Sequence, residues 1–343
     1  MTLKTYVVTR ILLTIPMIFI LLTPVFIVMR VLPGDPVQMH FEKAASPAVI
    51  DAMRAQLGLD KPILIQYFDY VAGLFRGDLG KSMQDFSPVG QQIFSAFPAT
   101  LELAICSMII AVLTGIFLGV ESAKSYGKPK DHLIRFIGII SYAIPVFFLG
   151  MIFQLIFGVY LHWLPTGGRI APGMEPAGLT IGNTHIATGL YTIDSLLGGN
   201  PIQFFNSIKY LLLPSLTLGI VLCGIFIRLT RTNMFETIRL DFVTAAKARG
   251  LKDSTVTYRY ALRNAFLPIL TMMGLQFALL LGGAVLTETT FSWPGLGRYL
   301  VDRISFRDYT AIQGVVVVFG IFVAFASLIV DLLYAYLDPR IRL

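Results

Sequence analysis

The stretch AFLPILTMMGLQFALLLGGAVLT, residues 265–287, decides the fold class of this chain, because it carries no charged side chain over a length that crosses a bilayer as a helix. A hydrocarbon core about 30 Å thick requires roughly 20 apolar residues in a helix. Further stretches that meet this requirement lie at about 9–29, 99–121, 134–160, 209–228 and 311–335. The sequence therefore predicts an all-α membrane protein with about six transmembrane helices.

The composition of the whole chain favours the same fold class. Of 343 residues, 55% are hydrophobic and only 14% are charged, which is too little polar surface for a soluble globule of this size. A net charge of +7 suits a membrane protein that retains Lys and Arg on its cytoplasmic side, so we expect no nucleic-acid partner. Neither the cysteines, Cys106 and Cys223, nor the scattered histidines have the spacing of a metal site.

Basic residues are distributed unevenly between alternate connections. Most Lys and Arg residues fall in the connections at about 122–133 and 228–264 and at the two ends, whereas the longer connections at about 30–98 and 161–208 carry nine of the 20 acidic residues. The positive-inside rule then predicts that both termini are cytoplasmic.

The connections differ in their expected structure. In the first outer connection, Ser46 can cap a helix that has Pro47 at its first position and ends near Gly58, and a second helix is expected at Pro62–Phe75. The connection 161–208 is rich in Gly and Pro and is expected to be irregular. We divide the chain into 1–98, the first transmembrane helix with a folded external loop, and 99–343, a five-helix core with the inner connection 228–264.

The centre of the inner connection reads DFVTAAKARGL, residues 241–251. Asp241 can accept hydrogen bonds at a helix start and Gly250 suits the left-handed position after a helix end, so a helix of about two turns is expected. Its alanines permit close approach of another surface, and Phe242, Val243 and Leu251 would give that surface something apolar to bury. From the residues alone, a docking helix and an ordinary basic loop both remain open. The residues concerned are Asp241, Phe242, Val243, Thr244, Ala245, Ala246, Lys247, Ala248, Arg249, Gly250 and Leu251.

The order Ala245-Ala246, Gly250 and then Leu267-Pro268 resembles the cytoplasmic signature of binding-protein-dependent ABC importer permeases. Thr244 stands where the broad family usually has Glu, and the distance from Gly250 to Leu267 is longer than in the general pattern. The longer form resembles the first permease subunit of the dipeptide/oligopeptide/nickel branch. Strings typical of that branch recur in order along the chain: RVLPGDP (30–36), LGLDKP (57–62), GDLG (77–80), TETTFSWPGLGR (287–298), RDY (307–309) and DPR (338–340).

This resemblance implies a type I ABC importer permease fold in a prokaryotic inner membrane. It implies a pore subunit that is not itself an enzyme and that imports peptides, with nickel or an oligosaccharide as alternative substrates. The implied partners are a second homologous permease, two ATP-binding subunits and an external substrate-binding protein. ATP and Mg²⁺ would bind to the ATP-binding subunits, this chain would carry no cofactor, and residues 241–251 would contact the ATPases.

Some polar and aromatic residues near the predicted helix ends are weaker candidates for a pathway or gate: Glu102, Gln154, Gln276, Glu288 and Trp293. Ionisable groups inside a membrane are costly and often functional, but near helix ends structural capping is the simpler role. Trp293 fits an aromatic belt at the membrane boundary, with an outer gate as the alternative. An ion-gradient transporter or an intramembrane enzyme is a rival class, although midplane ionisable residues, inverted repeats and a catalytic set are not apparent.

Overall fold

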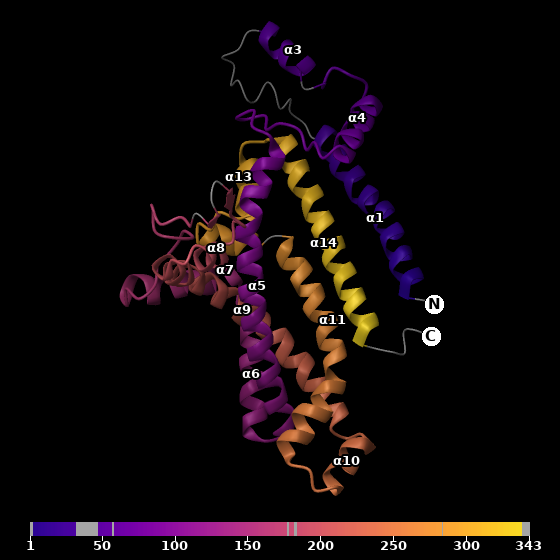
Figure 1. The fold of residues 1–343 in the computed structure, drawn as a ribbon, viewed down its shortest axis with the longest axis vertical. Helices are drawn as coiled ribbons and strands as arrows, with labels where there is room; N and C mark the ends of the chain where they lie inside the picture. Colours follow the sequence, from indigo (N-terminus) through magenta and orange to yellow (C-terminus); the bar gives the residue numbers. More distant parts are fainter. Residues whose placement is uncertain are drawn as a thin grey trace.

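The computed structural model of the chain describes residues 3–31, 47–56, 58–176, 178–181, 184–282 and 284–337. The described residues form an elongated helical bundle, with α3 (Pro47–Gln56) and α4 (Ile63–Phe75) near one end and α10 (Asp241–Ala248) at the other (Figure 1). We call these ends the α4 pole and the α10 pole. They correspond to the predicted outer and cytoplasmic sides.

The remaining elements follow one another along the chain. They are α1 (Leu3–Val31), α5 (Val89–Lys124), α6 (Pro129–Ala143), α7 (Val146–Phe153), the π-helix η1 (Gln154–Tyr160), β1 (Leu179–Ile181), β2 (Thr184–Ile186), α8 (Tyr191–Leu197), α9 (Pro201–Thr237), the π-helix η2 (Thr255–Ala261), α11 (Leu262–Leu281), α12 (Val285–Thr290), α13 (Leu296–Ser305) and α14 (Tyr309–Leu337).

Among the described residues, four helices are long and apolar enough to cross a membrane: α5, α9, η2 continued by α11, and α14. The bent pair formed by α6 and α7–η1 provides up to one more. Together with α1, a helix of 29 residues that contains the apolar run at 9–29, these helices agree with the predicted count of about six.

The third predicted crossing, 134–160, is not one continuous helix. Its two halves meet at an angle of 100° between Ala143 and Val146. Pro145 has no backbone N–H, and the residue before a proline is disfavoured in the helical region, so Ile144 adopts an extended conformation with ψ 126°. The predicted helix over 134–160 is therefore interrupted at Pro145.

Two further boundaries differ from the predictions. The fifth crossing ends at Leu281 instead of 287, and a separate short helix, α12, follows it. The connection 161–208 is not wholly irregular, because it contains the antiparallel hairpin of β1 and β2, with Leu179 opposite Ile186, and the helix α8. The first outer connection contains both predicted helices. Gly58 has the positive φ of 66° that a helix stop requires, whereas Ser46 lies outside the described residues.

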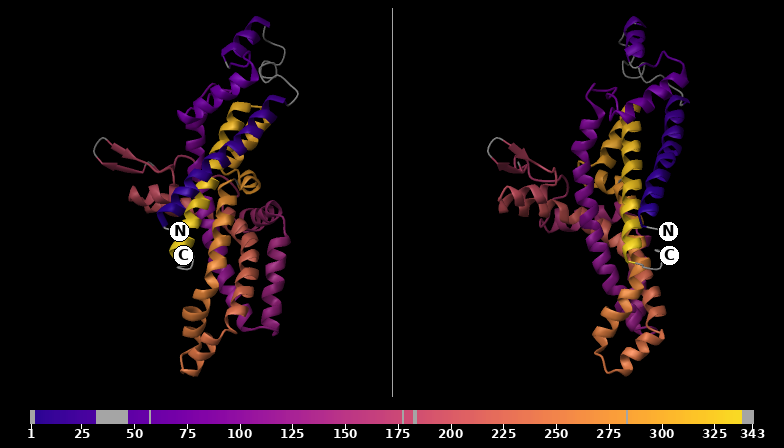
Figure 2. Two further views of the ribbon diagram at one scale, coloured as in Figure 1. Left: turned by 90° about the vertical axis from the view of Figure 1, so that its right-hand side faces the viewer. Right: turned by 45° about the vertical axis from the view of Figure 1, so that its right-hand side comes forward.

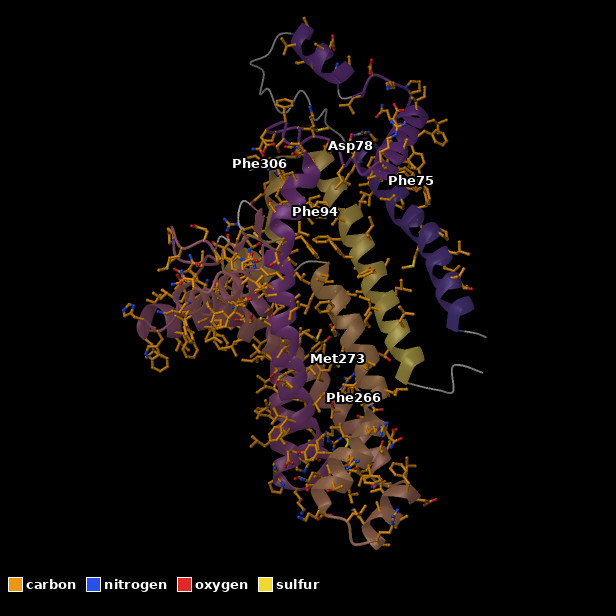
Figure 3. All side chains as sticks on the ribbon, viewed as in Figure 1. Phe75, Asp78, Phe94, Phe266, Met273 and Phe306 are labelled. Atoms are coloured by element: carbon orange, nitrogen blue, oxygen red, sulfur yellow. The ribbon has the colours of Figure 1, made fainter. Side chains whose placement is uncertain are left out.

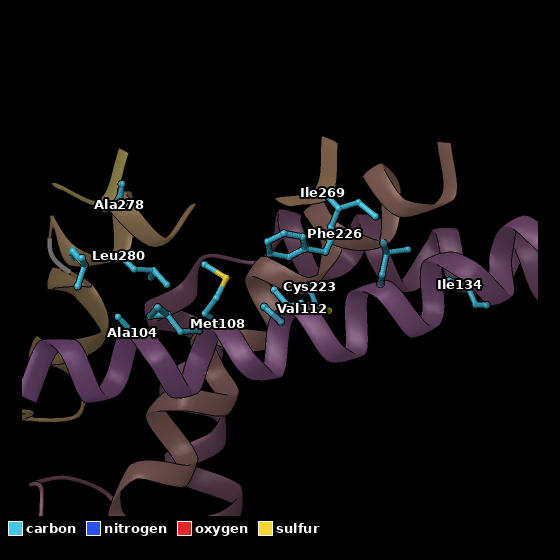
Figure 4. Close-up of a cluster of buried hydrophobic side chains, with 14 residues drawn as sticks. Ala104, Met108, Val112, Ile134, Cys223, Phe226, Ile269, Ala278 and Leu280 are labelled. Atoms are coloured by element: carbon cyan, nitrogen blue, oxygen red, sulfur yellow. The ribbon is translucent and has the colours of Figure 1, made fainter. Parts of the chain in front are cut away.

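The centre of the bundle is held by close packing of α5 on α9. A Cβ atom built on Gly219 of α9 would lie 2.7 Å from Cγ2 of Ile110 on α5, so only glycine allows this approach. Gly115 and Gly119 of α5 face Phe226 and Thr230 of α9 in the same way. Small residues at such crossings let helices in a membrane gain van der Waals contact. The buried cluster around Met108, Cys223 and Phe226 fills the seam (Figure 4).

At the edge of the bundle, α14 packs between α11 and α1. Two further views show α1 and α14 side by side, with the start of α1 near the end of α14 (Figure 2). The start of α1 and the end of α14 therefore lie in the same region of the molecule.

Candidate functional site

The helix α10 forms the tip of the α10 pole. It starts after Leu240 and is followed by Gly250, whose φ of 72° is the left-handed value expected after a helix end. Asp241 is not the helix cap that the sequence suggests, because it occupies the first helical position and makes no side-chain cap bond. Its charge still lies at the helix N-terminus, where the helix dipole stabilises an acidic group.

One face of α10 is buried in the chain itself. Val243 and Ala246 join an apolar cluster with residues from α5, α9, η2 and α11, and Leu251 packs against its edge. Val243 is therefore not part of a surface offered to a partner, contrary to the prediction. The exposed face presents Asp241, Phe242, Thr244, Ala245, Lys247, Ala248, Arg249 and Gly250.

This burial links α10 mechanically to the transmembrane helices. Met234 from α9, Val120 from α5 and Val256 from η2 all pack in the cluster that holds Val243. Because close-packed interiors transmit displacement, a movement of α10 must be accompanied by a movement of the ends of these helices at the α10 pole.

A buried carboxylate joins three helices at the same pole. Asp131 of α6 accepts hydrogen bonds from Ser122 Oγ at 2.5 Å and from the Gly127 amide at 3.1 Å. Arg231 of α9 donates to it from Nε at 2.7 Å and from Nη2 at 2.9 Å. Bidentate pairing of this kind fixes geometry as well as charge. The turn between α5 and α6 is therefore fixed to α9.

Stacked side chains extend this connection towards α10. The rings of Tyr126 and Phe235 lie 4.1 Å apart, and the guanidinium of Arg239 lies 3.8 Å above the Phe235 ring. Arg231 lies over the other ring, at 5.2 Å from the centroid of Tyr126. Sequence reasoning took these arginines only as signs of orientation and missed the connection, although an acidic residue in the first turn after Pro129 was a visible signal.

The string TETTFSWPGLGR is organised around Glu288. The Glu288 side chain is fully buried and accepts hydrogen bonds from Thr100 Oγ1 at 2.6 Å and from the Arg298 amide at 3.0 Å. The second of these bonds caps the start of α13. Any Cβ on Gly295 would collide with the carboxylate, and one on Gly297 would lie 2.9 Å from Glu288 Oε2. Both glycines of the string are thus required by the buried acid.

Trp293 lies inside the protein. Its indole is fully buried, donates from Nε1 to the Ala99 carbonyl at 2.8 Å and packs with Leu103 and Leu211. The expectation that Trp293 belongs to an aromatic belt is therefore wrong. The role of Trp293 in an outer gate stays a prediction.

Glu102 lies about one helical turn after Ala99 on α5 and is also buried. Its Oε2 accepts Arg169 Nη2 at 2.7 Å, and its Oε1 accepts the amide of Thr192 at 2.8 Å. The Arg169 guanidinium also donates to the Gly189 carbonyl at 2.6 Å and lies 3.8 Å above the Tyr191 ring. This ion pair attaches the connection 161–208 to α5. No local pattern in the sequence indicates which residue pairs with Glu102.

The two glutamine candidates lie in different surroundings. Gln154 Nε2 donates to the carbonyls of Thr166 at 2.6 Å and Thr290 at 2.9 Å, so it connects η1 to the connection 161–208 and to the end of α12. Gln276 Nε2 lies 3.7 Å from Met272 Sδ within α11. Whether either side chain lines a pathway stays a prediction. Among the described residues, no group of three His, Cys, Asp or Glu side chains could hold a metal ion.

Two strings that are distant in sequence meet at the α4 pole. Ser82 Oγ donates to Asp308 Oδ2 at 2.5 Å, and the Met83 amide donates to Asp308 Oδ1 at 3.1 Å. A Cβ on Gly80 would lie 2.7 Å from Thr310 Cγ2. The strings GDLG and RDY thus form one joint between the first outer connection and the start of α14.

An exposed carboxylate extends this joint. Arg303 lies 3.6 Å from Asp308 and donates to Asp85 Oδ2 at 3.3 Å. Partial burial acts to raise the pKa of Asp85, but hydrogen bonds from Ser87 and Gln92 outweigh it and hold this pKa well below its ordinary value.

Comparison with known proteins identifies the same family over both parts of the chain. The family described as binding-protein-dependent transport system inner membrane component matches residues 111–343, and the model of its N-terminal part matches residues 3–104. A dipeptide transport system permease protein of Alkalihalophilus pseudofirmus is 40% identical over 338 residues, which cover 98% of this chain and 99% of that protein. A probable D,D-dipeptide transport system permease protein of Escherichia coli is 42% identical over 316 residues, 92% of this chain and 91% of that protein.

A solved structure supports the fold alone. A chain of the MetNI methionine ABC transporter, in an inward-facing conformation, superposes with a TM-score of 0.52 at 15% identity. The match covers 72% of this chain and 97% of that chain.

Proposed function

Since this chain belongs to the family of binding-protein-dependent transport system inner membrane components, we propose that it is the pore-forming subunit of an ATP-driven importer of short peptides. The names of its relatives support the substrate class, because two proteins matched over more than nine-tenths of this chain are described as dipeptide permeases. As a permease, the chain would depend on partner subunits for ATP hydrolysis, with ATP and Mg²⁺ bound there.

The observation that carries the mechanism is the position of α10. Its outward face is exposed at the tip of the α10 pole, while Val243 and Ala246 anchor it to α5, α9 and η2. We propose that the exposed residues of 241–250 dock on a cytoplasmic ATPase. Closure of the ATPases on nucleotide would then displace α10 and shift the transmembrane helices between inward-open and outward-open states.

The same proposal assigns each of the two poles to one side of the membrane. The α10 pole faces the cytoplasm, and the α4 pole, with the connections 30–98 and 161–208, faces a substrate-binding protein. The support is the excess of Lys and Arg in the connections at the α10 pole. A second homologous permease would complete the pathway.

One purification tests the proposal. The tagged full-length chain, isolated from its native membrane and placed in proteoliposomes, is expected to bring two ATPase subunits and a second permease with it. Its ATPase activity should rise when a binding protein loaded with dipeptide is added. Peptide uptake driven by an ion gradient without ATP would contradict the proposal.

A further inference from the structure

The helix α4 presents an apolar face that no described residue covers. Leu64, Phe68 and Phe75 are 69%, 67% and 76% exposed, and their spacing places them on one side of the helix. No residue of α4 is fully buried. Three large apolar side chains in one row are more than the scattered exposed residues of an ordinary surface.

An adjoining side of α4 is attached to α1, and Phe75 lies at the border between the two sides. Tyr67 OH and Thr23 Oγ1 lie 2.8 Å apart, within hydrogen-bond distance. The rings of Tyr67 and Phe26 lie 5.3 Å apart, and those of Phe75 and Phe19 lie 6.2 Å apart where α4 approaches α1 (Figure 3). The two helices therefore run side by side in opposite directions, starting from the end of α1 that lies at the α4 pole.

Arg30 marks the level at which α1 leaves the apolar layer. It is the charged residue in the last turn of α1, and its guanidinium lies 5.2 Å from the centroid of the Phe26 ring. A long basic side chain at a helix end extends to the headgroups. Phe19 precedes Arg30 along α1. Phe75, beside Phe19, thus lies on the hydrocarbon side of that level.

The ends and the composition of α4 limit how deep it lies. Arg76 and Asp78 follow the helix directly, so its end must stay near water. With 13 residues, the helix is shorter than the roughly 20 that a span requires. Asp69 is the single charged residue of α4, and it pairs with Lys61 at 2.7 Å. A short helix with one apolar face can rest that face against acyl chains without crossing the bilayer.

We propose that α4 is a lipid-embedded interfacial helix of the outer leaflet, with Leu64, Phe68 and Phe75 in contact with acyl chains. Lipid is the occupant favoured over a protein because α4 packs on α1, a helix expected to cross the membrane that itself exposes Leu13, Met17 and Ile20. Protein docking surfaces, by contrast, surround their apolar centre with polar groups. α4 would then tether the folded external loop to the membrane surface.

The neighbouring helix α3 provides a matched control. It belongs to the same external loop, but Asp51 on it is exposed and pairs with Arg54 at 2.9 Å. A probe at position 51 should remain in water while a probe at position 68 sits in lipid.

The test uses the full chain with its co-purified partners in nanodiscs. The variants Phe68→Cys, Leu64→Cys and Asp51→Cys are labelled with the environment-sensitive fluorophore NBD, and the unaltered chain measures background labelling of Cys106 and Cys223. Lipids brominated on the acyl chain should quench the probes at 68 and 64 at least about twofold more than the probe at 51.

Three results would overturn the proposal. The first is water-like emission at 68 and 64 that matches position 51. The second is blue-shifted emission that brominated lipid leaves unquenched, which would mean that a protein covers the face. The third is loss of lipid quenching when a binding protein is added. None of these readouts requires transport, so failure here is separate from failure of the proposed function.

Discussion

Arg231 and Asp131 form a bidentate ion pair between α9 and α6, with N–O distances of 2.7 and 2.9 Å. Ser122 of α5 donates to the same carboxylate, so one buried acid joins three helices beside α10. Replacing Asp131 by Asn leaves Arg231 without its counter-ion. We expect the free energy of unfolding to fall by about 2 kcal/mol. This is less than the loss on breaking a fully buried ion pair, because Arg231 is partly exposed. Thermal unfolding of the purified chain in detergent measures it.

Glu121 provides the control for this variant. It pairs with Lys124 at 3.1 Å and also with Lys130, at the protein surface. Glu121→Gln should cost less than about 1 kcal/mol, as exposed ion pairs do. Equal losses for the two variants would show that Asp131 has no special structural role.

The sequence predicted the transmembrane helices well because apolar length alone determines them. It also placed α10 correctly, since Gly250 is a strong helix stop. It could not predict that Val243 faces inward, because the short helix exposes apolar residues on more than one side and only packing on α5 and α9 selects the buried one.

The polar joints were the least predictable part. Glu102 and Arg169, or Ser82 and Asp308, are far apart in sequence, so no local pattern pairs them. Trp293 was misassigned because position near a helix end is shared by belt residues and by buried anchors. Only the contact with Ala99 distinguishes the two.

Gly250 tests the proposed docking of α10. A Cβ there would meet nothing within 4 Å, so a large side chain would project into the space that a partner would occupy. Gly250→Trp should reduce co-purified ATPase at least about tenfold, a binding loss of about 1.4 kcal/mol or more. Quantitative blotting of the purified complex measures it.

A substitution at Gly173 is the control that distinguishes loss of docking from backbone strain. It has a φ of 79°, its Cβ would also meet nothing within 4 Å, and it lies in the connection 161–208. Gly173→Trp carries the same left-handed strain of about 1–2 kcal/mol but should keep the ATPases bound. If both variants lose ATPase equally, strain and not docking explains the loss.

Trp293→Phe removes the indole N–H that donates to Ala99 while keeping most of the buried ring. The lost hydrogen bond and the smaller ring should together lower the stability by about 1–3 kcal/mol in thermal unfolding. Trp163 is 62% exposed, so Trp163→Phe should change the stability by less than about 0.5 kcal/mol. A larger loss of stability for Trp163→Phe than for Trp293→Phe would contradict the assignment of Trp293 as a buried structural residue.

Asp85 predicts a response to acid. Its pKa is lower in the folded than in the unfolded chain, so its contribution is fully present above its unfolded value, about pH 4, and is lost as the pH falls further. The difference in apparent Tm between the unaltered chain and Asp85→Asn should therefore be largest near pH 7 and shrink near pH 3. A difference that stays constant over this range would contradict the prediction.

Gly295 and Glu288 should be energetically coupled, because the backbone of Gly295 is ordinary for any residue, with φ −97°, and only the buried carboxylate excludes a side chain there. Gly295→Ala should cost about 1–3 kcal/mol through overpacking. Glu288→Ala should also destabilise the chain, because Thr100 and the start of α13 lose their acceptor. In the double variant the collision is gone, so the combined loss should fall short of the sum by about 1 kcal/mol or more. Thermal unfolding of the four chains measures the cycle, and additive losses would mean that the glycine is not required by the acid.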